Sequence, residues 1–430
     1  ALVYFQVQKA SARAAVYRPI ETDEARKWGI GYGLDIAITQ GYTSRLVAQQ
    51  AYAELRWLKG KLTVGAKEEP MIMKNTKLST GAQTLGINAR PIPQIRVALP
   101  DYWTLPVFNG WLHLKGHLAY GAMTDQNWQH DFTGKKSRYA DNVLYHSKAG
   151  FLKISNEEVF CPWSLEMVTL FGGTGYVIQP NGKMQPMKGG TRPRDFINAL
   201  LPGGSDAGET TYQNIAGDQL GSWMAKLKYD GDWHMVAIYA DKFFEDQSSM
   251  FQLDYDGYGS GTEWTKKVKR RFLLYDFKDW QIGFEYNYKP DNWINDFVFE
   301  YLYTQYQSGP IYHDHTNTIA DHIGGKDNFY NHYIYTGHQH WGQVMGNPLY
   351  RSPIYNTDGR ILVANNRFEA FHIGLGGHPS EYLDWRFLAT WQKGLGTYEE
   401  PYFDQHHNVS LLAEASYRFL GNRYRWLDGM

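Results

Sequence analysis

Apolar and polar side chains alternate with a period of two along many segments of this chain. Residues 280–288 show the pattern most clearly, with an apolar set of Trp280, Ile282, Phe284, Tyr286 and Tyr288 and an intervening set of Gln281, Gly283, Glu285 and Asn287. Successive side chains of a β-strand point to opposite faces of its sheet. The segment is therefore predicted to be a strand with one apolar and one polar face.

The same alternation recurs along nearly the whole chain. It is clear near residues 30–38, 112–120, 297–303, 383–391 and 409–419, and weaker near 12–19, 45–57, 61–67, 92–99, 143–154, 163–172, 222–229, 233–241 and 366–376. The clear runs are longer than the strands of about 5–6 residues that are usual in soluble proteins. Their outward faces are almost purely aromatic and aliphatic. The alternative is a soluble β-sandwich or propeller, but these features favour an all-β, transmembrane antiparallel β-barrel.

Composition changes this picture in one respect. The mean hydropathy of -0.52 would suit a soluble protein, yet 16% of the residues are aromatic, as two interfacial girdles would require. No run of about 18 apolar residues is present, which excludes a transmembrane helix. The net charge of -1 gives no argument for nucleic acid. The single cysteine, Cys161, excludes an intramolecular disulfide bond.

The chain is expected to form one outer-membrane barrel domain over residues 1–430, since no linker or shift in composition divides it. Its length of 430 residues fits about 16–18 strands. Long loops are expected near 173–221, 242–270 and 305–365, with a helix-like stretch at 194–201 and tight turns at 230–232 and 289–292. The first residues lack the pattern of a signal peptide, so we interpret the sequence as a mature chain.

Residues 311–355 contain the densest group of chemically active side chains. The histidines and aspartates are His313, Asp314, His315, His322, Asp327, His332, His338 and His340, interleaved with aromatic rings. The two His-x-His pairs could chelate a metal, but no carboxylate or cysteine completes a recognised spacing. The segment could instead form a hydrogen-bonded plug in the barrel. It could also bind sugars, and these last two roles are compatible.

Sugar binding gives the most specific set of candidate residues. Flat aromatic rings stack on pyranose rings, and polar side chains satisfy the sugar hydroxyls. The stacking candidates are Tyr330, Tyr335 and Trp341, and the hydrogen-bonding candidates are Asp327, Asn331, His332, His340 and Arg351. We predict no metal site among them. The alternative is that these residues only hold a plug together.

Signatures of catalysis are absent from the sequence. There is no nucleophile elbow and no dinucleotide-binding glycine loop. Residues 172–175 are rich in glycine, but they lack the lysine and the helix of a phosphate site. We therefore expect no enzymatic activity, no catalytic residues and no cofactor.

The strand register predicts which side chains face lipid. Trp280, Phe284, Tyr286, Trp385 and Val409 are expected to face lipid, and Gln281, Glu285, Arg386 and Glu414 to face inward. His113, Lys115, His117 and Arg418 belong to the same inward set. These inward residues could line an open lumen or anchor a plug.

Several short motifs of the sequence resemble those of the Wzi family of capsule-assembly outer-membrane barrels. They are Asn88–Pro93 before a strand, Arg192–Phe196 in a loop, Gly217–Gly221 entering a strand, and Asp327–Asn331 followed by Gly346–Leu349. They extend over roughly residues 30–420. The better-known members carry a helical bundle before the barrel, whereas strand-like sequence begins here almost at Ala1.

The resemblance implies an 18-stranded barrel with a lumen blocked by loops and lectin-like binding of surface polysaccharide. We therefore expect a polysaccharide-binding protein of the Gram-negative outer membrane that acts in capsule or exopolysaccharide assembly. Its expected partners are surface polysaccharide, outer-membrane lipid and other outer-membrane proteins, without nucleic acid. The alternatives are a substrate-specific porin and a barrel subunit of a larger surface complex.

Overall fold

The computed structural model describes residues 10–23, 26–40, 43–155, 158–202, 216–245, 251–253, 257–258, 262, 265–268, 272–274, 278–312 and 323–418. Fifteen strands form its main sheet. They are β1 (Ala10–Arg18), β2 (Trp28–Gln40), β3 (Leu46–Trp57), β4 (Gly60–Ala66), β5 (Gln94–Thr104), β6 (Leu112–Ala122), β8 (Leu144–Ser155), β9 (Val159–Phe171), β12 (Asp218–Asp230), β13 (His234–Glu245), β18 (Trp280–Tyr288), β19 (Asn292–Tyr303), β24 (Phe368–Ser380), β25 (Leu383–Gly396) and β26 (Pro401–Tyr417).

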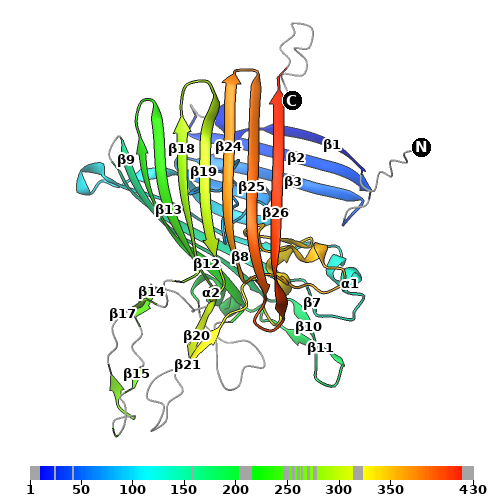
Figure 1. Ribbon diagram of the computed structural model, residues 1–430. Coiled ribbons are helices and arrows are strands. Elements are labelled where there is room, and N and C mark those ends of the chain that lie inside the picture. The colour runs from blue at the N-terminus through cyan, green and yellow to red at the C-terminus, as the bar shows by residue number, and fades with distance from the viewer. Residues whose placement is uncertain are drawn as a thin grey trace.

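Each strand of the main sheet pairs antiparallel with the strands before and after it in this list, and β1 and β26 stand at the two ends of the order. Figure 1 shows the sheet curling around an interior. The predicted all-β antiparallel fold is therefore confirmed. Each of the fifteen strands overlaps one of the alternating segments found in the sequence, although several bounds differ. Within the described residues the main sheet has fifteen strands, next to the predicted number of about 16–18.

The two faces of the sheet differ in the sense that the sequence predicts. In β2 the exposed fraction alternates along the whole strand. Ile30 is 57% exposed and Leu34 46% exposed, whereas Asp35 between the outward residues of the strand is fully buried. The outer face is therefore apolar and the inner face polar or small. This arrangement is the reverse of that in a soluble protein and suits a sheet surrounded by lipid.

Exposed tryptophans gather where the strands meet their short turns. Trp28 begins β2 and Trp57 ends β3, and their rings stack with centroids 5.7 Å apart. Trp233 precedes β13 and Trp293 lies near the start of β19, and each side chain is more than 60% exposed. Indole rings prefer the boundary between hydrocarbon and water. These residues therefore form an aromatic girdle at this end of the sheet, which we call the turn end.

The opposite end, the loop end, carries the long connections and the smaller elements. The helices are α1 (Trp128–Thr133), α2 (Pro193–Leu200), η4 (Thr336–His338) and η5 (Pro353–Tyr355), and the short strands are β7 (Tyr139–Asp141), β10 (Thr174–Ile178), β11 (Met184–Lys188), β14 (Phe251–Leu253), β15 (Gly257–Tyr258), β16 (Lys267–Val268), β17 (Phe272–Leu274), β20 (Ser308–Tyr312), β21 (Ile323–Lys326), β22 (Gln339–His340) and β23 (Gln343–Val344). The turn end has the tight turn that joins β12 to β13, together with η1 (Ile20–Asp23) and η2 (Phe108–Gly110). Among the described helices, none is long and apolar enough to cross a membrane.

Candidate functional site

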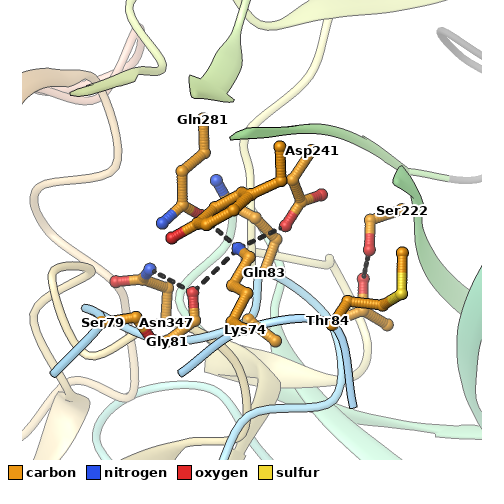
Figure 2. Close-up of polar contacts among 12 residues, drawn as sticks. Lys74, Ser79, Gly81, Gln83, Thr84, Ser222, Asp241, Gln281 and Asn347 are labelled. Carbon is orange, nitrogen blue, oxygen red and sulfur yellow. Dashed lines mark hydrogen bonds and ion pairs between the residues drawn. The ribbon is translucent and has the colours of Figure 1, made fainter. Parts of the chain in front are cut away.

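The connection between β4 and β5, residues 67–93, crosses the interior of the curled sheet. Figure 2 shows its Lys74, whose ammonium group lies 2.6 Å from Oδ2 of Asp241 and 2.6 Å from Oε1 of Gln281, and which also donates to the carbonyl oxygen of Gly81. The side chains of Lys74 and Asp241 are 1% and 2% exposed. A buried ion pair is tolerated when hydrogen bonds satisfy the remaining donors and acceptors. Lys74 meets this condition with three acceptors, whereas Oδ1 of Asp241 is buried without a hydrogen-bond partner among the described residues.

Two inward carboxylates hold the same connection. Glu300 of β19 accepts hydrogen bonds from the amide of Thr80 at 2.6 Å and from Nε2 of Gln281 at 2.8 Å. Glu285 of β18 accepts from the amide of Asn75 at 3.0 Å, and the ammonium group of Lys226 lies 2.6 Å away. Gln281 is fully buried and Glu285 is 3% exposed, so both side chains face inward as the sequence predicts.

The connection also contacts the next two strands of the sheet, β24 and β25. Nε2 of His372 on β24 lies 2.7 Å from the carbonyl oxygen of Leu78, and Nη1 of Arg386 on β25 donates to the carbonyl of Lys77 at 2.9 Å. Arg386 also pairs with Glu414 of β26 and lines a turn-end cavity of about 410 Å³. Residues 67–93 were not among the predicted long loops. The wide gap between the alternating segments 61–67 and 92–99 was the signal that could have identified them.

Tyr330, a predicted stacking residue, lies at the centre of the interior. Its side chain is fully buried and its hydroxyl donates to the carbonyl of Gln83, while the amide of Asn347 donates to the hydroxyl at 3.1 Å. Nδ2 of Asn347 in turn donates to the carbonyl of Gly81 at 3.0 Å (Figure 2). Tyr330 therefore joins the two connections that fill the interior.

His340 and Trp341 form a second junction with the 67–93 connection, and His340 also contacts Thr124 in the connection between β6 and β8. Nδ1 of His340 lies 2.8 Å from the carbonyl of Arg90, and its Nε2 lies 3.3 Å from the amide of Thr124. The guanidinium group of Arg90 stands 4.5 Å from the centroid of the Trp341 ring. His340 is 1% exposed and Trp341 8% exposed. Both side chains pack within the protein.

His332 and Asn331 order the backbone of their own connection, whereas Tyr335 binds the backbone just after β9. The hydroxyl of Tyr335, which is 2% exposed, donates to the carbonyl of Gly172 at 3.1 Å. Nδ1 of His332 accepts from the amides of residues 334 and 335. The side chain of Asn331 makes two hydrogen bonds with the backbone of Val363. The three predicted stacking rings, Tyr330, Tyr335 and Trp341, therefore offer little free surface here, and sugar binding by them stays a prediction.

Arg351 is the one exposed residue of the predicted set, and Asp327 is half-buried, as Asn331 and His332 are. Arg351 is exposed, and its guanidinium group donates to the carbonyl of Tyr355 at 2.6 Å. Asp327 is half-buried, and its amide donates to the carbonyl of Gln307. The predicted residues lie in one connection but do not converge on one open surface.

Burial lowers the pKa of two histidines in this region, to about 4 for His332 and to about 3 for His338. Both imidazoles are therefore neutral near pH 7. His313, Asp314, His315 and His322 lie outside the described residues. Within the described part of the chain, no group of three or more His, Cys, Asp or Glu residues could hold a metal.

Two exposed tyrosines at the loop end each lie beside an arginine. Tyr333 is 49% exposed, and the guanidinium group of Arg138 stands 5.5 Å from the centroid of its ring. Tyr355 is 58% exposed and is held through its carbonyl by Arg351. Exposed rings next to arginine donors can stack on sugars and bind their hydroxyls. Neither tyrosine was among the predicted site residues, although both lie in or beside the predicted segment.

A separate cavity of about 120 Å³ lies between the 67–93 connection and the inner faces of β5, β6, β8 and β9. Glu69, Gln94, Arg96, His117 and Glu166 are among its polar lining residues. Oε1 of Glu69, Oε1 of Gln94 and Nε of Arg96 are buried and have no hydrogen-bond partner within the described part of the chain. Such groups usually bind ordered water or a polar ligand.

Comparisons with known proteins place the chain beside outer-membrane β-barrels without assigning a family. No protein-family model and no curated protein matches the chain. The similar solved structures include Wzi of Escherichia coli, described as a carbohydrate-binding β-barrel involved in group 1 capsule assembly. It is 12% identical, with 95% of this chain and 82% of Wzi covered and a TM-score of 0.45.

Two other structures are similar at a comparable level. OmpT of Vibrio cholerae is 9% identical over 95% of this chain and 89% of its own, with a TM-score of 0.40. An anion-selective porin of Comamonas acidovorans is 10% identical over 96% and 89%, with a TM-score of 0.37. TM-scores below 0.5 are too low to establish a common family. The resemblance to the Wzi family therefore stays a prediction.

Proposed function

We propose that this protein spans the outer membrane of a Gram-negative bacterium as a β-barrel, and that its loop end binds surface polysaccharide for capsule or exopolysaccharide attachment. The apolar outer face of the sheet and the tryptophan girdle at its turn end support the location. The proposal assigns no catalytic role to any residue.

The buried network of hydrogen bonds around Lys74 is the main support for the proposal that the interior is closed. Lys74 connects the 67–93 connection to Asp241 and Gln281 on the wall, and Asn347 connects it to the 327–351 segment. A porin would need these contacts to open, because they run across the space that a solute would use. The porin thus remains the second candidate, and a barrel subunit of a larger complex is the third.

The exposed pairs Tyr333 with Arg138 and Tyr355 with Arg351 support glycan binding at the loop end. Their rings are accessible to a polymer outside the cell, whereas the buried Tyr330, Tyr335 and Trp341 can position the segment that carries them. Single sugar contacts are weak, so binding of a repeating polymer would depend on avidity.

Conductance in planar bilayers tests closure of the interior. The purified protein should give little or no stable current, and deletion of residues 311–355 should open a conducting path. A steady wild-type current that a sugar blocks would instead support the porin.

A polysaccharide pull-down tests the loop-end site. The variant Tyr333→Ala/Tyr355→Ala should retain less polymer than the wild type. The matched variant Tyr333→Phe/Tyr355→Phe keeps both rings and should retain most of the polymer. Equal retention by the alanine variant, with heat-modifiable folding intact, would place the site elsewhere.

A further inference from the structure

Three lysines lie together on the inner wall near the turn end. Lys115 of β6 and Lys153 of β8 stand 5.7 Å and 4.7 Å from the centroid of the Tyr102 ring. Lys153 and Lys228 of β12 stand 5.0 Å and 5.5 Å from the centroid of the Phe160 ring. We call Lys115, Lys153 and Lys228 the lysine cluster. Two aromatic rings thus hold three ammonium groups on neighbouring strands.

The strand register places the lysine cluster inside the sheet. Lys115 shares its face of β6 with His117, which is 6% exposed, and Lys153 shares its face of β8 with Phe151, which is 1% exposed. The pairing of β5 with β6 shifts between Leu99 and Trp103. Tyr102 lies in this irregular stretch and packs against an interior cluster that contains Phe151. The three lysine side chains remain half-buried and therefore accessible to solvent.

Two of the three lysines in the lysine cluster, Lys115 and Lys153, differ from other inward lysines because they form no ion pair in the described part of the chain. Lys74 pairs with Asp241, Lys61 with Glu54 and Lys226 with Glu285. By contrast, only Lys228 of the cluster has an ion pair, with Asp230 at 2.8 Å, in the part of the chain that the structure describes. Lys115 and Lys153 form no ion pair there, although the negative charges of Asp101 and Glu69 act on Lys115 from a greater distance.

The lysine cluster adjoins the 120 Å³ cavity described above. His117, two positions along β6 from Lys115, lines that cavity together with Arg96, whose Nε is buried without a partner among the described residues. Charges of one sign on a low-dielectric wall attract anions more strongly than the same charges in bulk water. Arg96 thus adds a further positive group near the lysine cluster, in a cavity whose lining also contains the carboxyl groups of Glu69 and Glu166.

We propose that the lysine cluster binds the carboxylate groups of an acidic oligosaccharide at the turn end. The ammonium groups pair with the carboxylates, and the rings of Tyr102 and Phe160 contact the apolar edges of the sugars. This site is at the opposite end of the sheet from the proposed loop-end surface and does not depend on it.

Calorimetric titration of the detergent-solubilised full chain with tri-galacturonate tests the proposal. The wild type should bind at low salt, with weaker binding at high salt, and the neutral trimer maltotriose should bind much more weakly. Lys115→Gln/Lys153→Gln should weaken tri-galacturonate binding by about tenfold or more, since each charged contact contributes strongly to affinity. Lys183→Gln/Lys188→Gln, on the β10–β11 hairpin, removes the same charge elsewhere and should bind as the wild type does.

Two further measurements make the result decisive. Lys115→Arg/Lys153→Arg keeps the charge and should restore most of the binding, which a purely structural role would not require. Inorganic phosphate should compete weakly, because it offers one anionic group where the trimer offers three. The proposal is overturned if the wild type fails to bind the trimer, or if the folded glutamine variant binds it unchanged. Loss of polymer retention in the Tyr333/Tyr355 variant would leave this titration unaffected.

Discussion

The ammonium group of Lys74 lies 2.6 Å from the carboxylate of Asp241, although 167 positions separate the two residues in the chain. The pair fastens a loop to the wall that it faces. The strength of this ion pair is therefore expected to affect the stability of the packed interior.

Lys74→Met should destabilise the protein by about 3–5 kcal/mol, because Asp241 would keep a buried charge without its partner. The measurement is the free energy of unfolding in denaturant with the protein in detergent or lipid. Lys77→Met is the matched control. Lys77 is exposed, and its backbone makes the contacts, since its amide donates to Asn75 and its carbonyl oxygen accepts from Arg386, so this change should have little effect. Equal losses in both variants would contradict a specific role for the Lys74 pair.

Phe284→Arg should cost about 2–4 kcal/mol if its position lies near the bilayer midplane, because the charge would enter lipid. Phe284 lies near the middle of β18, on its outward face. Spin labels at residues 284 and 409 should respond to a lipid-soluble quencher, and labels at residues 386 and 414 to a water-soluble one. Equal quenching of both sets by the lipid-soluble agent would refute this register.

Gly346→Ala should destabilise the interior by about 1–3 kcal/mol through overpacking. A Cβ atom at this position would collide with the hydroxyl of Tyr330 and the carbonyl of Gln83. Gly150→Ala on β8 is the control, because nothing lies within 4 Å of the added Cβ atom. Denaturant unfolding of the two variants provides the comparison, and similar midpoints would show that the contact at Gly346 can relax.

Acid should loosen the interior through its buried histidines. Burial lowers the pKa of His332 to about 4 and that of His338 to about 3, whereas an exposed imidazole has a pKa of about 6.5. Between pH 6.5 and the lowered pKa values, the unfolded chain therefore binds more protons than the folded chain does. The contribution of these two neutral histidines to the free energy of unfolding is fully present above about pH 6.5, and it decreases as the pH falls towards 4.

The measurement is the free energy of unfolding at pH 7.5 and at pH 4.5. Each neutral histidine should account for about 2–3 kcal/mol of the loss between these values. His338→Phe should reduce the loss by that amount, because both ring nitrogens of His338 lack hydrogen-bond partners within the described part of the chain. An unaltered pH dependence in His338→Phe would contradict this explanation.

The strands could be predicted because lipid and a polar interior impose opposite requirements on alternate residues. This local signal identified β18 from nine residues without any knowledge of its neighbours. The filling of the interior has no such local signal. Lys74 meets Asp241 and Gln281 only because the sheet curls, and a lysine in a loop gives no indication of this in the sequence.

The candidate site shows the same limit. A dense group of aromatic and polar residues at 327–351 correctly indicated a structured segment, but composition does not distinguish buried rings from exposed ones. Tyr330 and Tyr333 are three positions apart, and one is fully buried while the other is half exposed. Only the packing of the segment against the 67–93 connection separates the two.

The antiparallel order of the main sheet also sets the geometry at its two margins. With fifteen strands that reverse direction at every step, β1 and β26 run the same way, from the loop end towards the turn end. Direct pairing between them would need the slanted hydrogen bonds of a parallel ladder. A single additional strand between β1 and β26 would instead be antiparallel to both. Every pair of neighbouring strands around the sheet would then be antiparallel.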